Sequence, residues 1–430
     1  MSLTSVVINL KTNQKTVLDT AQVSVSAQNT LTLLRGQTFF TSACIIRNDK
    51  GMFLLCLDAH YERMVRCYQT MFERNDVPFS YETFKQYVEY AIDQNSHVEA
   101  SYLHCVILCV AGKSRKTMFD TGTYANGFGG GLEEMIILID PFESKPDWCF
   151  NEGINLVSFP YQRPLAEAKP TFYIGGVVAQ HVLDAVNAYA CVLKQTSANT
   201  YEHCLKAAFN VYEALSVKQQ KTFRLCINSL FFSVATTIDF SDIGLLLQQL
   251  PKPIEQLLTS YLTAPSCNSI QLLLKNDFSQ LLHETFFVSS DEQNPFVLEG
   301  STFSLMGINQ ADECVFIPLK GNSTQTDDLN TGYILESTFT KMLLHIVKKA
   351  NLNYKIEPIL AADLTKLKAL YCVSTRRCTD KELTFKFQPC RSINAQPLAT
   401  ETSKTYTKLL EYVNAFVDNY SYDVCITDTV

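Results

Sequence analysis

The chain has 430 residues, of which 47% are hydrophobic and 18% are charged, and its net charge is −7. This balance is typical of globular proteins, and the length allows two or three domains. Lysine and arginine residues are scattered, so the basic patch of a nucleic-acid-binding protein is not expected. The sequence shows neither the run of roughly 18 to 20 apolar residues that a membrane helix needs nor a signal-peptide pattern. We therefore expect a cytoplasmic protein that binds neither nucleic acid nor membranes.

The fifteen cysteines stand singly in apolar stretches, and no two of them are spaced as C-x-x-C. An odd number of isolated cysteines predicts buried free thiols in a reducing compartment rather than disulfides. The seven histidines include no pair at the spacing of metal ligands. We therefore assign no metal site.

The first 160 residues are rich in predicted strands. Alternation of β-branched and polar residues predicts a hairpin followed by four further strands. These lie in residues 5–25, 33–46, 52–57, 99–110 and 135–139. Residues 81–93 have helical periodicity. The glycine cluster at residues 126–131 precedes a strand rather than a helix, so we interpret it as a flexible loop and not as a phosphate cradle.

A second helix of this part is expected to begin at Asp58, which is a favourable N-cap residue. Met64 and residues 67 and 71 are spaced for one apolar face. His60 and Arg63 are three positions apart and share a side of the helix. Taken alone, this pattern favours a solvent-exposed face.

Helical periodicity dominates the middle of the chain. A helix at residues 177–193 is followed by a region whose apolar stripes are typical of a helical core, without a motif that carries chemistry. Its helices are expected at residues 200–215, 218–235, 241–250, 253–262 and 269–282. We interpret residues 197–282 as an inserted all-α subdomain.

Strand character then resumes. The expected strands lie in residues 286–288, 296–306, 314–319, 369–373 and 383–387, and the expected helices in residues 338–350 and 403–416. The overall pattern predicts an α+β protein. Its domains would be residues 1–160, residues 161–196 together with 283–430, and the helical subdomain.

Lys169 lies in a mostly uncharged run, with Arg163 upstream and Tyr173 downstream. If the protein buries this lysine, the loss of solvation lowers the pKa of the amine toward the range in which it is nucleophilic. A lysine that forms a Schiff base needs this property, although most lysines in such a run lie on the surface.

Glu299 ends an otherwise apolar stretch, where a buried carboxylate requires a cationic or protonated partner. Arg63 is suited to binding a phosphate with its forked guanidinium. A ligand with an aldehyde, a protonatable ring nitrogen and a phosphate would satisfy Lys169, Glu299 and Arg63 together. Pyridoxal 5'-phosphate has these three groups.

The order and the local sequences of these segments resemble those of the class IV aminotransferases. This fold-type IV pyridoxal-phosphate family includes branched-chain and D-amino-acid aminotransferases and aminodeoxychorismate lyase. The resemblance covers most of the chain outside roughly residues 195–283, and the order and spacing of its motifs carry it. The motifs lie in residues 23–41, 58–64, 163–173, 296–302, 331–338 and 371–376.

The resemblance implies a two-domain fold like that of D-amino-acid aminotransferase. It implies that Lys169 forms the Schiff base and moves the substrate proton, that Glu299 pairs with the pyridine nitrogen, and that Arg63 binds the phosphate. Other residues that it places at the cofactor are Tyr173 near the ring and Ser337, Thr338, Ser374 and Thr375 near the phosphate. Candidates for binding the substrate carboxylate are Arg376 and Arg377.

Three features depart from the family pattern. Ser304 stands where the family often has Asn. The turn at residues 335–339 reads Leu-Glu-Ser-Thr-Phe and lacks the usual glycine and arginine. Lys169 and Glu299 are 130 positions apart (299 − 169) rather than a few tens, and the inserted helices account for the excess.

The function expected on this basis is transfer of an amino group between an amino acid and a 2-oxo acid by a ping-pong route, in a homodimer. One alternative is an elimination enzyme of the aminodeoxychorismate lyase type. Another, from a different class, is a non-catalytic relative whose inserted helices bind a protein partner.

Overall fold

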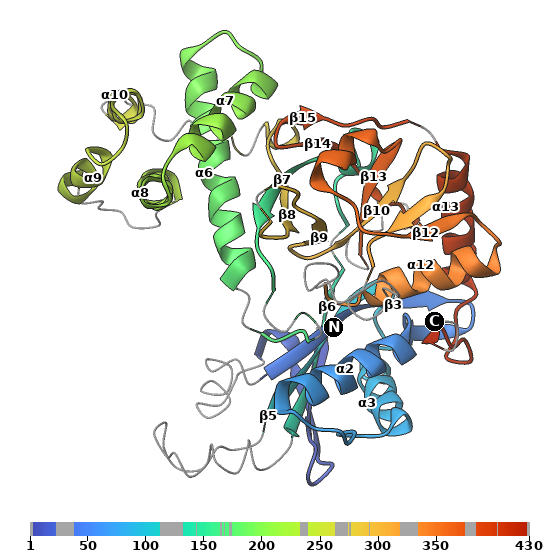
Figure 1. The fold of residues 1–430 in the computed structure, drawn as a ribbon. Coiled ribbons are helices and arrows are strands. Elements are labelled where there is room, and N and C mark those ends of the chain that lie inside the picture. Colours follow the sequence, from blue (N-terminus) through green and yellow to red (C-terminus); the bar gives the residue numbers. More distant parts are fainter. Residues whose placement is uncertain are drawn as a thin grey trace.

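The computed structural model describes residues 3–22, 38–111, 132–142, 144–163, 166, 168–171, 174–232, 240–262, 274, 277–291, 293–318, 334–374, 384–401 and 403–427. The first strands form a six-stranded sheet in the order β2-β1-β6-β5-β3-β4 (Figure 1). The strands are β1 (Thr4–Asn9), β2 (Lys15–Asp19), β3 (Thr38–Asn48), β4 (Gly51–Leu54), β5 (Tyr102–Ala111) and β6 (Leu132–Pro141).

Strand alternation gives β3 two different faces. Phe39 and Ala43 point into a core shared with the helices α2 (Leu57–Phe72) and α3 (Tyr81–Asp93). Phe40 and Ser42, at the alternate positions, line a cavity on the other side. One face of this sheet is therefore structural, and the other contributes to a candidate site.

The later strands form a nine-stranded mixed sheet in the order β12-β11-β10-β13-β14-β7-β8-β9, with β15 beside β14. These are β7 (Ile154–Pro160), β8 (Glu284–Val288), β9 (Val297–Gly300), β10 (Ser304–Ile308), β11 (Cys314–Phe316), β12 (Tyr354–Ile356), β13 (Ala369–Val373), β14 (Gln388–Ile393) and β15 (Gln396–Pro397). β7 and β8 are parallel neighbours. Parallel neighbours require a long crossover, and here the crossover contains the helical region.

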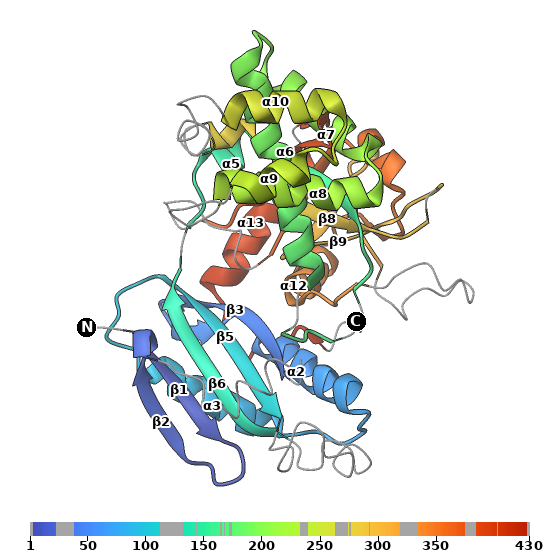
Figure 2. The same ribbon diagram turned by 90° about the vertical axis from the view of Figure 1, so that its left-hand side faces the viewer.

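The crossover begins with α6, whose buried face forms one core with the following helices. The helices are α6 (Ile174–Thr196), α7 (Tyr201–Ala214), α8 (Val217–Ile227), α9 (Phe240–Leu247) and α10 (Lys252–Leu262), with the π-helix η2 (Asn228–Phe232) and the 3-10 turn η3 (Phe278–Gln280). These helices lie beside the nine-stranded sheet (Figure 2). Asn187 fixes the returning chain, because its side chain donates to the carbonyl of Leu282 at 2.8 Å and accepts from the amide of Leu282 at 2.9 Å.

In contrast to the expectation from sequence, α6 is long and apolar enough to cross a membrane by length and composition alone. In this structure, however, 61% of its most apolar window is buried inside the molecule. Because the core helix of a soluble protein has the same properties, this is weak evidence for a membrane span.

Two helices join the sheets. The helices α12 (Thr338–Lys349) and α13 (Lys404–Asp418) pack on β10, β11 and β13, and the same core includes Cys44 and Ile46 of β3. The remaining short elements are η1 (Thr20–Gln22), α5 (Trp148–Asn151) and η4 (Ala361–Lys366).

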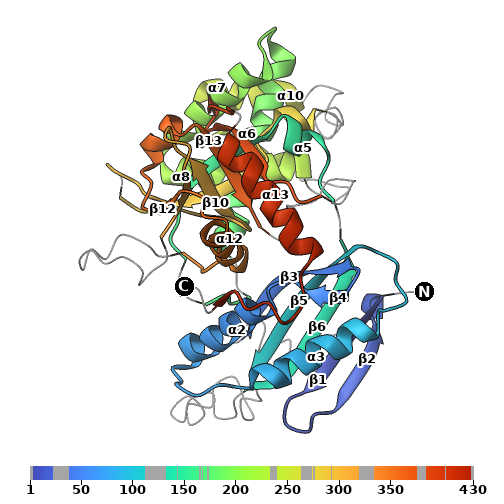
Figure 3. The same cartoon turned by 90° about the vertical axis from the view of Figure 1, so that its right-hand side faces the viewer.

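The segment after α13 runs back to the first sheet (Figure 3). The hydroxyl groups of Tyr420 and Tyr422 accept from the amides of Leu57 at 3.1 Å and Leu54 at 2.9 Å. Both tyrosine rings contact Phe53 edge to face. The C-terminal segment thus ties the helices of the second sheet to the start of α2.

Asp58 has a different role from the predicted N-cap. The N-cap of α2 is Cys56, in the left-handed backbone region with φ 59°, and the side chain of Cys56 makes no capping hydrogen bond. The buried carboxylate of Asp58 instead accepts from the amides of Ile426 at 2.5 Å and Thr427 at 3.0 Å. The N-cap prediction is therefore wrong, because a tertiary partner competes successfully for the carboxylate.

Other predictions had mixed outcomes. The helix at residues 81–93 and the strand at residues 369–373 are confirmed at their predicted bounds. The C-terminal end of the helix expected at residues 269–282 is wrong, since Phe278–Gln280 forms a 3-10 turn and residues 281 and 282 are irregular. The glycine cluster at residues 126–131 lies outside the described residues. The domain boundaries stay predictions.

The cysteines agree with the sequence analysis where the structure describes them. Cys425 is exposed and the other described cysteines are buried, all of them as free thiols.

Replacement of Asp58 by alanine should lower the free energy of unfolding by about 2 kcal/mol, because the amides of residues 426 and 427 would lose a charged acceptor. Urea unfolding would measure the change. Asp423→Asn is the matched control, since Asp423 is exposed and should change stability by less than about 0.5 kcal/mol. Equal stability of the Asp58 variant and the wild type would contradict the anchoring role.

Candidate functional site

The cavity between the two sheets has a volume of about 300 Å³. Six of the predicted site residues line it: Arg63, Lys169, Glu299, Ser337, Thr338 and Ser374. Tyr173, Thr375, Arg376 and Arg377 lie outside the described residues. The sequence segments that carried these residues are thus brought together by the fold, although they span more than half of the chain.

Lys169 lies on a segment that is bonded to β3. The amide of Phe40 donates to the carbonyl of Lys169 at 3.0 Å, and the amide of Thr171 donates to the carbonyl of Thr38 at 3.0 Å. The amide of Lys169 donates to the Sγ of Cys67 at 3.1 Å. Backbone contacts on both sides therefore fix the lysine at the wall of the cavity.

The amine of Lys169 has a low pKa. Its Nζ lies 4.9 Å from the centroid of the Phe40 ring. Desolvation by burial and, to a smaller extent, the nearby cations Arg63 and Arg163 lower the pKa of Lys169 to about 7. A large fraction of the amine is therefore uncharged near neutral pH, as a nucleophile requires.

Glu299 lies on β9 with 6% of its surface exposed, and Arg163 follows β7 with 8% exposed. The Nε of Arg163 donates to the Oε1 of Glu299 at 3.0 Å. A buried carboxylate without a partner is strongly destabilising, so this ion pair makes the position of Glu299 tenable. The next residue is Gly300, where a Cβ would come within 2.4 Å of the Phe303 ring.

Arg63 lies near the end of the second turn of α2, with 5% of its surface exposed. Its Nη2 donates to the backbone carbonyl of Glu336 at 2.5 Å and its Nη1 to the Oγ1 of Thr41 at 3.4 Å. Among the described residues, its Nε has no hydrogen-bond partner. Burial lowers the pKa of Arg63 to about 10, so the side chain is still a cation near neutral pH.

His60 is fully buried next to Arg63, and its Nδ1 lies 2.6 Å from the Oγ1 of Thr41. Burial, followed by the cations Arg63 and Lys169, holds the pKa of His60 well below its usual value. The histidine is therefore neutral near pH 7. The expectation that His60 and Arg63 lie on a solvent-exposed face is wrong, because His60 is bonded to Thr41 of β3 and Arg63 reaches the carbonyl of Glu336 in the second half of the molecule.

The first turn of α12 forms the other end of the cavity. Ser337 is the N-cap, and its side chain accepts from the amide of Thr340 at 3.1 Å. Thr338 and Phe339 begin the helix, and first-turn amides have no acceptor within a helix. A helix N-terminus of this kind, next to Arg63, is suited to binding an anion.

Sequence reasoning missed the role of Arg163. It identified Glu299 as a residue that needs a partner, and it noted Arg163 upstream of Lys169, but it did not connect the two. The signal was present as an arginine in an uncharged run. Only the adjacency of the segment after β7 to β9 makes Arg163 the partner.

The arrangement fits pyridoxal phosphate. It combines a lysine with a low pKa, a buried carboxylate held by an arginine, and a cationic side chain whose Nε has no partner among the described residues, beside a helix start. Within the part of the chain that the structure describes, no group of three or more histidine, cysteine or acidic side chains forms a metal site.

No family model matches the chain, and no curated protein matches it in sequence. Solved structures do match in fold. The branched-chain aminotransferase from the archaeon Thermoproteus uzoniensis, solved with norvaline, is 13% identical with a TM-score of 0.55, and the match covers 98% of this chain and 97% of that chain.

Two further structures agree. A hypothetical aminotransferase from Mycobacterium tuberculosis, in its apo form, is 12% identical with a TM-score of 0.52, covering 97% of this chain and 100% of that one. The fold IV transaminase CpuTA1 from Curtobacterium pusillum is 13% identical with a TM-score of 0.52, covering 96% of both chains. The chain therefore has the two-domain α+β fold of the fold-type IV aminotransferases.

Proposed function

We propose that this protein is a pyridoxal-phosphate-dependent aminotransferase that moves an amino group between an amino acid and a 2-oxo acid through Lys169. The observation that carries the proposal is the meeting of Lys169, the Arg163–Glu299 pair and Arg63 around one cavity. The shared fold supports it, since the hypothetical aminotransferase from Mycobacterium tuberculosis was also solved in a PLP-bound form, which is 13% identical to this chain with a TM-score of 0.50.

Each residue would have a distinct task. When bound, pyridoxal phosphate supplies an aldehyde for attachment to an amine and a ring that accepts electrons from the substrate. Lys169 would attack through its uncharged Nζ and later hold the proton removed from the substrate Cα. Glu299 would bind the ring nitrogen, while Arg163 offsets the cost of burying the carboxylate.

The phosphate would be held at the opposite end of the cavity. Arg63 would bind it with its guanidinium. The first-turn amides of α12 and the hydroxyl groups of Ser337, Thr338 and Ser374 would add hydrogen bonds, and the helix dipole favours an anion there.

Addition of pyridoxal phosphate should give the purified protein a yellow colour, with an absorption band near the visible edge that borohydride reduction removes. Lys169→Ala should lack the band, because Lys169 is the only lysine among the described residues that line the cavity. Lys355→Ala is the control, since this lysine forms a surface ion pair with Glu313. A wild-type protein that takes up no pyridoxal phosphate would refute the proposed function.

The rate at which Lys169 attaches pyridoxal phosphate should rise with pH through a midpoint near 7, the pKa of its amine. Below this pH the amine is protonated and not nucleophilic, and above it the rate should level off. Stopped-flow absorbance from about pH 5 to about pH 9 would measure the profile. Arg163→Gln removes a nearby cation and should move the midpoint upward, whereas a wild-type midpoint near 10 would contradict a desolvated lysine.

Amino acids should convert the yellow form in a single half-reaction, and a 2-oxo acid should restore it. Glu299→Gln should slow this conversion by roughly 100-fold, because a neutral amide does not stabilise a protonated ring nitrogen. The variant should nevertheless attach the cofactor. A screen with L- and D-amino acids, followed by absorbance, would give the rates. If the conversion yields a free elimination product and a 2-oxo acid does not restore the yellow form, the protein would instead be a lyase.

A further inference from the structure

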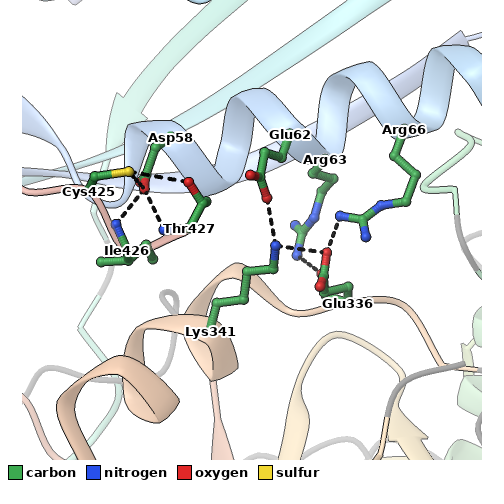
Figure 4. A network of polar contacts seen from close by, with 9 residues as sticks. All are labelled: Asp58, Glu62, Arg63, Arg66, Glu336, Lys341, Cys425, Ile426 and Thr427. Atoms are coloured by element: carbon green, nitrogen blue, oxygen red, sulfur yellow. Dashed lines mark hydrogen bonds and ion pairs between the residues drawn. The ribbon is translucent and has the colours of Figure 1, made fainter. Parts of the chain in front are cut away.

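Glu336 is the centre of an ion-pair network between α2 and the start of α12 (Figure 4). Its carboxylate pairs with Arg66 of α2 and, at 3.2 Å, with the Nζ of Lys341 of α12. Lys341 also pairs with Glu62 of α2 at 2.7 Å. The backbone carbonyl of Glu336 accepts from Arg63.

The position of Glu336 is electrostatically unfavourable for the proposed site. Glu336 directly precedes Ser337, the N-cap of the helix start that would face a phosphate. A carboxylate at this place repels a second anion. If charge alone mattered, loss of Glu336 should strengthen phosphate binding, and loss of Lys341 should weaken it.

The geometry indicates a different role. Lys341 is fixed one turn into α12, where its amide donates to the carbonyl of Ser337 at 3.0 Å, and its side chain reaches back to both acids. Arg66 lies one turn after Glu62 on α2, so two consecutive turns of α2 hold the network. The first turn of α12 is thereby joined to the helix that carries Arg63.

Burial makes this joint sensitive to the loss of either partner. The side chains of Lys341 and Glu336 are 9% and 14% exposed. Loss of Glu336 would leave Lys341 with Glu62 alone, and loss of Lys341 would leave Glu336 with Arg66 alone. A buried charge that loses one of its partners is costly, so the neighbouring chain is expected to shift rather than to keep its place. A shift of the turn at Glu336 would move the acceptor of Arg63 and the first-turn amides together.

We propose that Glu336 and Lys341 are positioning residues that set the preference of this site for a phosphorylated ligand, by fixing Arg63 against the first turn of α12. This inference rests on the proposed function, because it concerns the phosphate of the same cofactor. It assigns to Glu336 the opposite effect from the one that its charge alone would produce.

The test compares pyridoxal phosphate with pyridoxal, which has the same ring and aldehyde but no phosphate. Absorbance titration of the protein gives its affinity for each ligand. The affinity for pyridoxal phosphate divided by the affinity for pyridoxal is the ratio that measures the contribution of the phosphate. In Glu336→Gln and in Lys341→Met, the affinity for pyridoxal phosphate should fall by about tenfold, as expected for loss of one charge-assisted hydrogen bond. The affinity for pyridoxal should change by less than about twofold.

Two further variants keep the test informative if a buried substitution prevents folding. Lys341→Arg retains the cation and should preserve the ratio. Glu62→Gln removes the outer partner, whose side chain is 41% exposed, and should lower the ratio in the same direction but less. Lys368→Met is the matched control and should leave the ratio unchanged. Lys368 pairs with Asp312 at 3.0 Å, near the ends of β10 and β13 that lie away from the cavity.

The outcomes separate the alternatives. Tighter binding of pyridoxal phosphate by Glu336→Gln would overturn the positioning role in favour of simple charge repulsion. Equal losses for both ligands would overturn it in favour of a general structural role. A wild-type protein that binds neither ligand would refute the proposed function itself, and the inference with it.

Discussion

The buried ion pair between Arg163 and Glu299 is the interaction on which the candidate site depends. A carboxylate inside a protein is tenable only with a partner, and removing one member of a buried pair costs more than the pair itself contributes. Arg163 follows β7 and Glu299 lies on β9, and the two strands flank β8. The carboxylate therefore meets its partner only when this part of the sheet is assembled. Lys169 lies six residues beyond Arg163 in the same segment.

Helix α2 is the second organising element, because it faces the second half of the molecule with charged residues. Asp58 binds the C-terminal segment, Arg63 reaches the cavity, and Glu62 and Arg66 hold the start of α12. These contacts lie on successive turns of one helix (Figure 4). The relative placement of Arg63 and the lysine is thus determined by polar contacts along the whole interface and not by the cavity residues alone.

Local signals predicted the elements that are governed by local physics. The helix α3 has a capping serine, Ser80, and an apolar face, and β13 is a short buried run of apolar residues, so both were predicted at their observed bounds. β14 was missed, although it lies between β13 and β7 at the centre of the second sheet. Its sequence contains Pro389 and Arg391 and lacks the alternation typical of strands, and its pairing partners come from distant parts of the chain.

The sequence by itself determined the fold class, the helical region in the crossover, and the three side chains whose chemistry suggests pyridoxal phosphate. These follow from periodicity, composition and residue type, which are properties of short stretches. Only the tertiary structure decided that Arg163 is the partner of Glu299, that the side of α2 with His60 is buried, and that Glu336 is held by Arg66 and Lys341. Each of these depends on charges from segments far apart in sequence, and the cost of burying a charge can be evaluated only when its neighbours in space are known.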